Sequence, residues 1–231
     1  MKIDIGIIHF ERVFCLEKTI ISLSRFIKLL EERKLKGNIF ICDDSFSPVQ
    51  KEKCRDLAVK FGFTYLYTGG KKGLSENNNL LVSSSKAEIL LHLQDDFIMN
   101  AECVQLLITS VELFIKNKKQ IMLRAFNVEE KSDQFEFSDT PHFKKLNFHQ
   151  KVGLYPTNLP MDKAELFMKK VALGCFTKEH IAFTTSSCFI HIGQNFTFNP
   201  SIIREKKLKM LRVYNLYIFI SKTIKRILPK K

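Results

Sequence analysis

The sequence has no apolar run long enough to cross a membrane, and its six cysteines form no CxxC pair. A membrane-spanning helix needs about 20 mostly apolar residues, so no spanning segment is predicted. The N-terminal stretch MKIDIGIIHF has an acid inside a short apolar run and lacks a small-residue cleavage site, which favours a first strand over a signal peptide. Cysteines this widely scattered exclude zinc-finger spacing and favour reduced core residues. We therefore expect a cytoplasmic protein.

Three motifs of common enzyme classes are absent. The glycines and lysines of GGKKGLS, residues 69–75, lack the spacing of a phosphate-binding P-loop, and no GxGxxG follows the first predicted strand. No segment resembles a nucleophile elbow, so a Ser/His/Asp hydrolase is not indicated. We predict that residues 69–75 form a turn, in which Lys71 or Lys72 could lie near a phosphate.

The positive charge is concentrated at the C-terminal end of the sequence. Residues 204–231 contain ten Lys or Arg and one Glu, which is +9 of the net charge of +13. A protein that binds nucleic acid over its whole surface would carry basic groups across its body. We therefore expect no nucleic-acid partner.

Residues 201–231 are predicted to form a basic amphipathic tail. The apolar segment VYNLYIFI lies between REKKLKMLR and SKTIKRILPKK and is far too short to cross a bilayer. Lysines around an apolar aromatic patch suit a helix that lies on an anionic membrane surface. A terminal helix packed on the core, with solvated lysines, fits the pattern nearly as well. The inner-membrane surface is thus one expected partner, through residues 204–231.

Strand-like and helix-like patterns alternate along residues 3–128. Ser47, Pro48 and Gln50 have the spacing of a helix start, and Ser75 is predicted to open the third helix. This alternation predicts an α/β fold with a mostly parallel sheet covered by helices on both faces. Strands are predicted at 3–10, 38–44, 63–70, 88–96 and 120–128, and helices at about 16–30, 47–62, 75–87 and 102–117.

Two pairs of aspartates stand where predicted strands end. Asp43 and Asp44 end the second strand, and Asp95 and Asp96 end the fourth. Because ligands bind at the carboxyl ends of parallel strands, four carboxylates would gather at one edge of the sheet, where they repel one another unless a cation joins them. The alternative is helix capping for the first pair and the start of a loop leading to a cap at Asn100 for the second. The coincidence of both pairs favours a binding site.

Several segments resemble, in order and spacing, family-two glycosyltransferases of the GT-A fold. IGIIHFERVFCLEKTIISL, IFICDDS and GLSENNNLLVSSSKAEILLHLQDD are similar to the family's nucleotide-binding half, and PMDKAELFMKKVALG and FIHIGQNF to its acidic catalytic segment and late His-x-Gly. The resemblance implies a GT-A type nucleotide-diphospho-sugar transferase domain at 1–200, with a nucleotide-binding half at about 1–100 and an acceptor half at about 101–200. The family's Gly, Asn, small residue and acidic triplet fall on Gly73, Asn79, Ser85 and Gln94-Asp95-Asp96.

The resemblance implies a donor site at the ends of the second and fourth predicted strands. Asp43 or Asp44 would hold the base or ribose of a nucleotide sugar, and Asp95 would lie close to the sugar or ribose. The remaining donor-binding residues implied by the motif are Gly73, Asn79 and Gln94.

Metal and catalytic roles follow from the same resemblance. Asp96 and His191 would hold Mn²⁺ or Mg²⁺, which stabilises a diphosphate leaving group, and Mn²⁺ accepts an imidazole more readily. A core histidine satisfied by hydrogen bonds is the alternative for His191. Asp162, with Glu165 one helical turn later as the fallback, would deprotonate the acceptor hydroxyl, which implies inversion at the anomeric carbon. Asp162 at the start of a helix is equally consistent with a structural first-turn acid.

The function implied is transfer of a hexosyl or N-acetylhexosaminyl group from a nucleotide-sugar donor, UDP-linked, to a glycan or lipid-linked acceptor. The resemblance to bacterial surface-polysaccharide and lipopolysaccharide enzymes implies that the protein would bind peripherally at the inner face of the plasma membrane. Three positions depart from the family pattern: Gln94 replaces the first acid of the triplet, Asn78 a frequent arginine, and Met161 the glutamate before the base. A non-catalytic or divergent nucleotide-sugar-binding module is therefore the second hypothesis.

Residues 129–158 match no part of the family and show no clear period. A segment of this length in a compact domain is typical of a functional loop or of a disordered segment. We expect it to border the acceptor, where Phe143, Phe148 and Tyr155 either stack on sugar faces or anchor the loop to the core.

Overall fold

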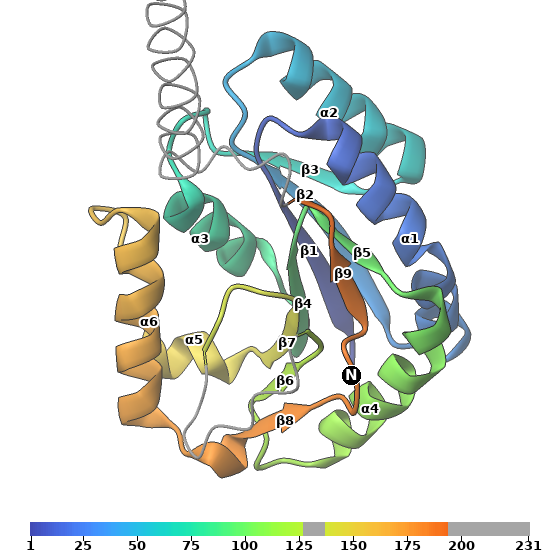
Figure 1. Cartoon of the computed structure of the whole chain (residues 1–231), viewed down its shortest axis with the longest axis vertical. Helices are drawn as coiled ribbons and strands as arrows, with labels where there is room; N and C mark the ends of the chain where they lie inside the picture. Colours follow the sequence, from blue (N-terminus) through green and yellow to red (C-terminus); the bar gives the residue numbers. More distant parts are fainter. Residues whose placement is uncertain (127–136, 194–231) are drawn as a thin grey trace, which may run out of the picture. The chain divides into compact units, whose positions relative to one another are not determined.

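A strand near the N-terminus, β1 (Ile3–His9), lies in the interior of the sheet, and every one of its residues is buried. The computed structural model describes residues 1–126 and 137–193. Its main sheet has seven strands in the order β3-β2-β1-β4-β7-β6-β8 (Figure 1). The other six strands are β2 (Lys36–Asp43), β3 (Thr64–Tyr67), β4 (Ile89–Gln94), β6 (Met122–Arg124), β7 (His142–Lys145) and β8 (Ile181–Phe183).

The sheet is mostly parallel, as the sequence predicts. β1 pairs in parallel with β2 and β4, β3 pairs in parallel with β2, and β8 with β6. β7, which the sequence pattern does not indicate, is antiparallel to both β4 and β6. In the register of the central strands, His9 lies opposite Asp43 and Ile8 opposite Gln94. The carboxyl ends of β1, β2 and β4 therefore meet at one edge.

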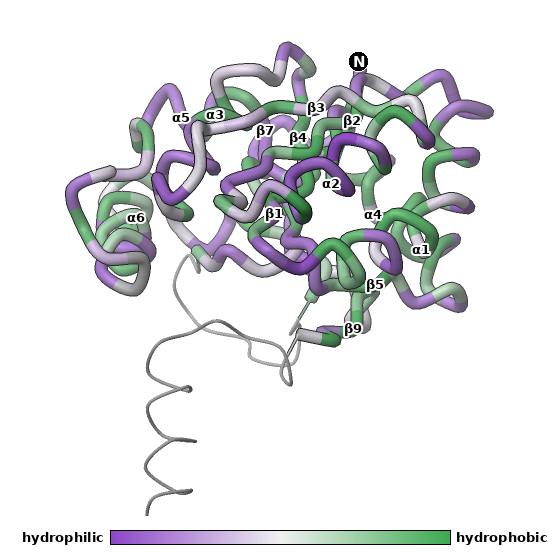
Figure 2. The backbone as a smooth tube through the Cα atoms, turned by 90° about the horizontal axis from the view of Figure 1, so that it is seen from above, coloured by the Kyte–Doolittle hydropathy of each residue, from purple (hydrophilic) through white to green (hydrophobic). Residues whose placement is uncertain are grey.

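Helices cover both faces of the sheet. One side has α1 (Val13–Glu32), α2 (Pro48–Phe61) and α4 (Val104–Lys116), and the other has α3 (Leu74–Ser84), α5 (Asn147–Val152) and α6 (Met161–Cys175), as Figures 1 and 2 both show. Four of the five positions that predicted α1 are fully buried, because they pack on the strands: Leu16, Ile20, Leu23 and Leu30. A second cluster around Phe148 and Met168 packs α5 against α6. All these elements belong to one compact unit, Met1–Ile192.

Local signals predicted one helix start correctly and missed another. Ser47 accepts a hydrogen bond from the Gln50 N–H and Pro48 is the first residue of α2, as predicted. The prediction that Ser75 opens α3 is wrong, because the helix begins at Leu74 with Gly73 as its N-cap. Gly73 has a φ of 92°, which a serine would adopt only with strain.

Residues 137–158 are not a long irregular loop. They contain β7 and α5, while 127–136 lie outside the described residues. Phe143 and Phe148 are completely buried and Tyr155 is 3% exposed. The expectation that these rings could stack on a sugar is therefore wrong, and the alternative that they anchor the segment to the core is confirmed.

None of the helices in the described part of the chain is both long and apolar enough to cross a membrane. The tail predicted at 201–231 lies outside the described residues.

Candidate functional site

The edge where β1, β2 and β4 end is held together by side-chain bonds to the backbone. Asn77 donates from its amide to the carbonyl oxygens of His9 (3.1 Å) and Cys42 (2.9 Å), which fixes the end of β1 against β2. On the other side, the Asp95 N–H donates to Ile8 O (2.9 Å), and the Thr19 hydroxyl donates to Asp95 O (2.7 Å). The backbone that carries Asp95 is thus fixed by both β1 and α1.

Two adjacent buried carboxylates at this edge share one arginine. Arg12 donates from Nη2 to Asp95 Oδ1 (2.5 Å) and from Nη1 to Asp96 Oδ2 (2.7 Å). Burial alone would lower the pKa of the Arg12 guanidinium, but the charges of Asp95 and Asp96 raise it. The other oxygen of Asp95 is 2.6 Å from His9 Nδ1. The sequence analysis missed Arg12, although its position just after the first strand was a usable signal.

His191 reaches the second of these carboxylates, Asp96, through a separate small sheet. β5 (Phe97–Met99) follows Asp96 directly and pairs antiparallel with β9 (Phe189–His191), so that Phe97 lies opposite His191. Their rings stack with centroids 4.7 Å apart, and the Ile192 N–H donates to Asp96 O (2.8 Å). As a result His191 Nε2 lies 3.1 Å from Asp96 Oδ2. The structure thus brings together two candidate metal ligands, Asp96 and His191, that are 95 positions apart in the chain.

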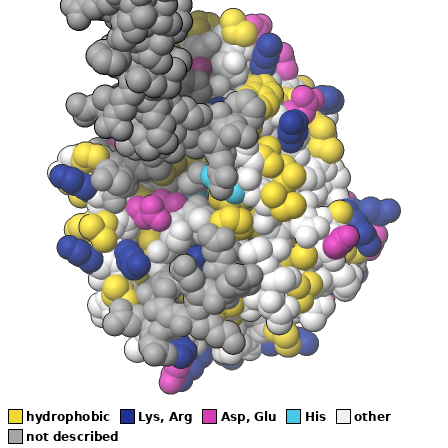
Figure 3. All heavy atoms as spheres, viewed as in Figure 1, with side chains coloured by type: hydrophobic (Ala, Val, Ile, Leu, Met, Phe, Trp, Pro, Cys, Tyr) yellow, Lys and Arg dark blue, Asp and Glu magenta, His cyan; other side chains and the backbone are white. Residues whose placement is uncertain are grey.

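The Asp96 and His191 pair suits a divalent cation. Two neighbouring ligands of an octahedral ion, each about 2.1 Å from it, are about 3 Å apart, close to the observed Nε2–Oδ2 separation. Asp96 Oδ1 is buried and has no hydrogen-bond partner in the described structure, so it is available as a ligand. The His191 side chain is 27% exposed, which gives the pair a route to solvent. In Figure 3, a histidine and a group of acidic side chains reach the surface on the same face of the described part.

A second set of potential ligands lies deeper. One ligand atom from each of His9, Asp43 and Cys54 lies within 4.8 Å of the others, and all three residues are buried. Burial and the charge of Asp43 raise the pKa of the Cys54 thiol, which opposes formation of a thiolate ligand. Asp96 and the partly exposed His191 form the better cation site, because His191 gives a cation a route from solvent.

The first pair of aspartates shapes the loop after β3. Asp44 accepts hydrogen bonds from the backbone N–H groups of Lys72 (2.9 Å) and Gly73 (2.7 Å) and from the Thr68 hydroxyl. Asp43 accepts from the Ser45 N–H and the Tyr65 hydroxyl, each at 2.8 Å. Both carboxylates are buried beside β1. Their contacts keep the turn at 69–73 against the edge that carries Asp95.

The remaining donor-site candidates differ in placement. Gly73 is the N-cap of α3, next to Asp44, and Gln94 is the half-buried last residue of β4. Asn79 donates to Tyr155 O (2.9 Å) and accepts from the Tyr155 N–H (2.8 Å). Both ends of its amide are thus engaged with backbone, which ties α3 to the segment before α6.

The candidate bases lie on α6. Asp162 is its second residue, and its side chain is outside the described part of the structure. Glu165 accepts a hydrogen bond from the Asp139 N–H (3.2 Å), and Asp139 accepts one from the Tyr155 hydroxyl (2.7 Å). Burial, helped by the charge of Glu165, raises the pKa of Asp139 to about 6. Asn79, Tyr155 and Asp139 therefore connect α3 to the helix that carries both candidate bases.

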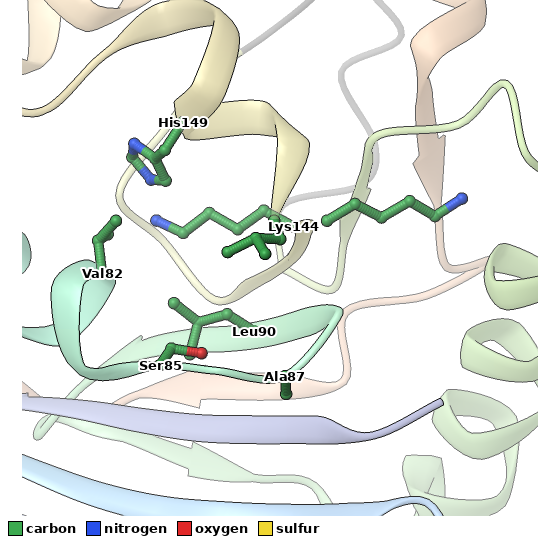
Figure 4. Close-up of a pocket in the computed structure, with 8 residues that line it drawn as sticks. Val82, Ser85, Ala87, Leu90, Lys144 and His149 are labelled. Atoms are coloured by element: carbon green, nitrogen blue, oxygen red, sulfur yellow. The ribbon is translucent and has the colours of Figure 1, made fainter.

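A buried lysine lies at the other end of β4. Lys144 and His149 line a small hollow with Val82, Ser85 and Leu90, shown in Figure 4. Lys144 is 1% exposed, and its Nζ has no hydrogen-bond partner in the described structure. Burial lowers its pKa to about 8, and the charge of Asp139 opposes this only in part. At pH 7 the protein thus carries a charge in a place that favours the neutral amine.

Replacing Lys144 with Met is expected to raise the free energy of unfolding at pH 7 by about 3 kcal/mol, because burial lowers the lysine pKa from 10.5 to about 8 and each unit costs about 1.4 kcal/mol. The folded protein binds fewer protons than the unfolded chain between about pH 8 and the ordinary lysine pKa of 10.5. The gain from Lys144→Met should therefore shrink as the pH rises through this window. Urea unfolding at pH 7 and 10 measures both effects, with the exposed Lys53→Met as the control. A less stable Lys144→Met protein at pH 7 would contradict the prediction.

No family model and no curated protein matches the sequence. The fold, in contrast, is similar to solved structures. Mannosyltransferase PcManGT from Pyrobaculum calidifontis, in complex with GDP-Man and Mn²⁺, has a TM-score of 0.66 and 12% identity over 88% of this chain and 60% of its own. S. aureus TarS 1–349 has a TM-score of 0.60 and 13% identity over 82% of this chain and 60% of its own, and it is also solved with UDP. This chain thus spans about three fifths of their length, and it has a glycosyltransferase fold of the GT-A type.

Proposed function

We propose that the chain is a metal-dependent, inverting glycosyltransferase that moves a sugar from a nucleotide-sugar donor, UDP-linked, to a glycan or lipid-linked acceptor. The observation that carries this proposal is the 3.1 Å approach of His191 to Asp96 at the carboxyl ends of the parallel strands. Support comes from the fold, which is shared with a mannosyltransferase that holds GDP-Man and Mn²⁺ and with a protein that holds UDP. The group transferred is hexosyl or N-acetylhexosaminyl.

Asp96 and His191 hold the divalent cation, Mn²⁺ or Mg²⁺, in this proposal. When bound, the cation neutralises the negative charge that builds on the diphosphate as the glycosidic bond breaks. Asp95 faces the sugar or ribose, and its 2.6 Å contact with His9 Nδ1 fixes its orientation. The nucleoside lies toward Asp43 and Asp44, over the turn that these carboxylates hold.

A carboxylate of α6 accepts the proton of the acceptor hydroxyl. Asp162 is the first choice and Glu165 the second. The bond from the Asp139 N–H keeps Glu165 directed toward the segment that Asn79 ties to α3. A base on the side of the sugar opposite the diphosphate gives inversion at the anomeric carbon.

The proposed acceptor is a glycan or a lipid-linked sugar at a membrane surface. A lipid-linked acceptor at the inner face of the plasma membrane, in surface-polysaccharide or lipopolysaccharide synthesis, would explain why residues 204–231 combine lysines with an apolar patch. This segment lies outside the described residues, so the sequence alone supports this part.

The test is incubation of the full chain with a panel of UDP- and GDP-sugars, with Mn²⁺ and with EDTA. We expect slow hydrolysis of one donor that requires the metal. Absence of binding or hydrolysis across the panel would overturn the proposal.

The same panel distinguishes a non-catalytic nucleotide-sugar-binding module. Asp162→Asn and Glu165→Gln are measured for donor affinity and for hydrolysis or transfer. If one of them is the base, its replacement lowers the rate of transfer and leaves donor affinity nearly unchanged, because the base contacts the acceptor. Unchanged rates in both variants would favour the binding module.

A further inference from the structure

Arg12 holds the acidic pair in a way that a cation would disturb. Its guanidinium joins two different carboxylates with one nitrogen each, at 2.5 Å to Asp95 and 2.7 Å to Asp96. The oxygen of Asp96 that it contacts, Oδ2, is also the one within 3.1 Å of His191 Nε2. A divalent cation held by Asp96 and His191 would therefore meet the positive charge of Arg12 at the same carboxylate.

The charges of the edge are balanced differently before and after a donor binds. Asp95 and Asp96 bring two negative charges and Arg12 one positive charge, so the three side chains together carry −1. A divalent cation adds +2, and the diphosphate of a nucleotide sugar adds at least two negative charges. The guanidinium then lies between a cation that repels it and an anion that attracts it.

Arg12 is placed so that it can exchange partners. It is the N-cap of α1, with φ of −131° and ψ of 50°, and so lies outside the regular helix. Its side chain is 13% exposed, which leaves the guanidinium within reach of a ligand at the surface. The side-chain hydrogen bonds described for it both go to the acidic pair. A planar guanidinium suits a phosphate as well as it suits two carboxylate oxygens.

Lys71 of the nearby turn contacts an aromatic ring, with its Nζ 4.1 Å from the centroid of the Phe46 ring. Lys72 contacts Asp44 through its backbone N–H. Among the described contacts, it is the Arg12 side chain that pairs its positive charge with both Asp95 and Asp96.

We propose that Arg12 changes partners when the donor binds. In the empty protein it is the counter-ion of Asp95 and Asp96, and with the cation and donor present it binds the diphosphate. The inference rests on the proposed function and adds to it a residue that contacts the leaving group. It implies that Arg12 opposes binding of the cation alone and favours binding of a nucleoside diphosphate together with the cation.

The experiment measures two affinities in wild-type protein, Arg12→Gln and Arg12→Lys. Mn²⁺ alone is titrated by electron paramagnetic resonance, and UDP and GDP are titrated by calorimetry at saturating Mn²⁺. Arg12→Gln should bind Mn²⁺ alone about threefold to tenfold more tightly, because a competing cation is gone, and the nucleoside diphosphate at least about tenfold more weakly. Arg12→Lys keeps the positive charge but loses the planar guanidinium, which can donate two hydrogen bonds to one phosphate. Its Mn²⁺ affinity should therefore stay near that of wild type, while its diphosphate affinity should be lower.

The control is Arg33→Gln, which removes an arginine next to the far end of α1, where it pairs with Glu112. It should leave both affinities unchanged. Thermal unfolding shows whether each variant is folded, and Mn²⁺ should raise the midpoint of Arg12→Gln more than that of wild type.

Equal diphosphate affinity in wild type and Arg12→Gln would overturn the inference and leave the proposed function standing. Weaker Mn²⁺ binding in Arg12→Gln would also overturn it. Failure of the wild type itself to bind UDP and GDP with Mn²⁺ would overturn both.

Discussion

Replacing Asp96 with Asn is expected to lower the rate of metal-dependent donor hydrolysis or transfer about a thousandfold, because a bound cation contributes several kcal/mol to stabilising the leaving group. The substitution keeps the size of the side chain but removes the charge next to His191 Nε2, 3.1 Å away. Arg12 keeps its hydrogen bond to Asp95, so the local structure at the carboxyl ends of the strands should be unchanged. The measurement is the initial rate over a range of Mn²⁺ concentrations.

Asp56→Asn is the matched control, since Asp56 is exposed on α2. It should retain full activity, and circular dichroism should show that both variants are folded. Activity of Asp96→Asn within tenfold of wild type would mean that the reaction does not depend on a cation at this carboxylate.

Asp4→Ala is expected to lower the free energy of unfolding by about 3–5 kcal/mol, because it leaves several buried donors without an acceptor. Asp4 is 1% exposed. Its Oδ1 accepts from the Asn38 N–H (2.7 Å), and its Oδ2 accepts from the Ser85 hydroxyl (2.8 Å) and the N–H groups of Lys86 (3.1 Å) and Ala87 (3.2 Å). One carboxylate thus joins the first residues of β1 to β2 and to the loop before β4.

Urea unfolding at pH 7 measures this loss, with the exposed Asp56→Ala as control. Because typical domains are stable by only 5–15 kcal/mol, Asp4→Ala should unfold at a much lower temperature than wild type. Asp4 lies at the opposite end of β1 from His9, so donor affinity of the folded fraction should not change. A loss below about 1 kcal/mol would show that water replaces the carboxylate.

Most strands and helices of residues 3–117 could be predicted because their patterns are local, although the short strand β5 was not. The apolar spacing of α1, the buried runs of β1 and β4, and the Ser47-Pro48 helix start each lie within a few residues and agree with the structure. The start of α3 could not be predicted, since it depends on Asp44, which accepts the Gly73 N–H from across the sheet edge. The strand β7 was missed for a similar reason, because its two neighbours, β4 and β6, decide its pairing.

The candidate site also has features that the sequence could predict and features that depend on packing. Asp43, Asp95 and Asp96 could be placed at one edge because the strands of a parallel sheet all end at the same edge. The bond between Asn79 and Tyr155 and the burial of Phe148 could not, since each depends on how the segment before α6 packs. Asn79, a donor-site candidate by sequence, has both amide groups engaged with that segment.

The sequence by itself determined the α/β class, the order of its first elements and the position of the acids at strand ends, because these depend on periodicity and chain direction. Only the tertiary structure decided that Arg12 spans both acids, and it brings His191 to Asp96, which the sequence indicated only through the family resemblance. The physical reason is that these contacts join segments far apart in the chain. They form only when β9 pairs with β5 and when α1 begins beside the end of β4.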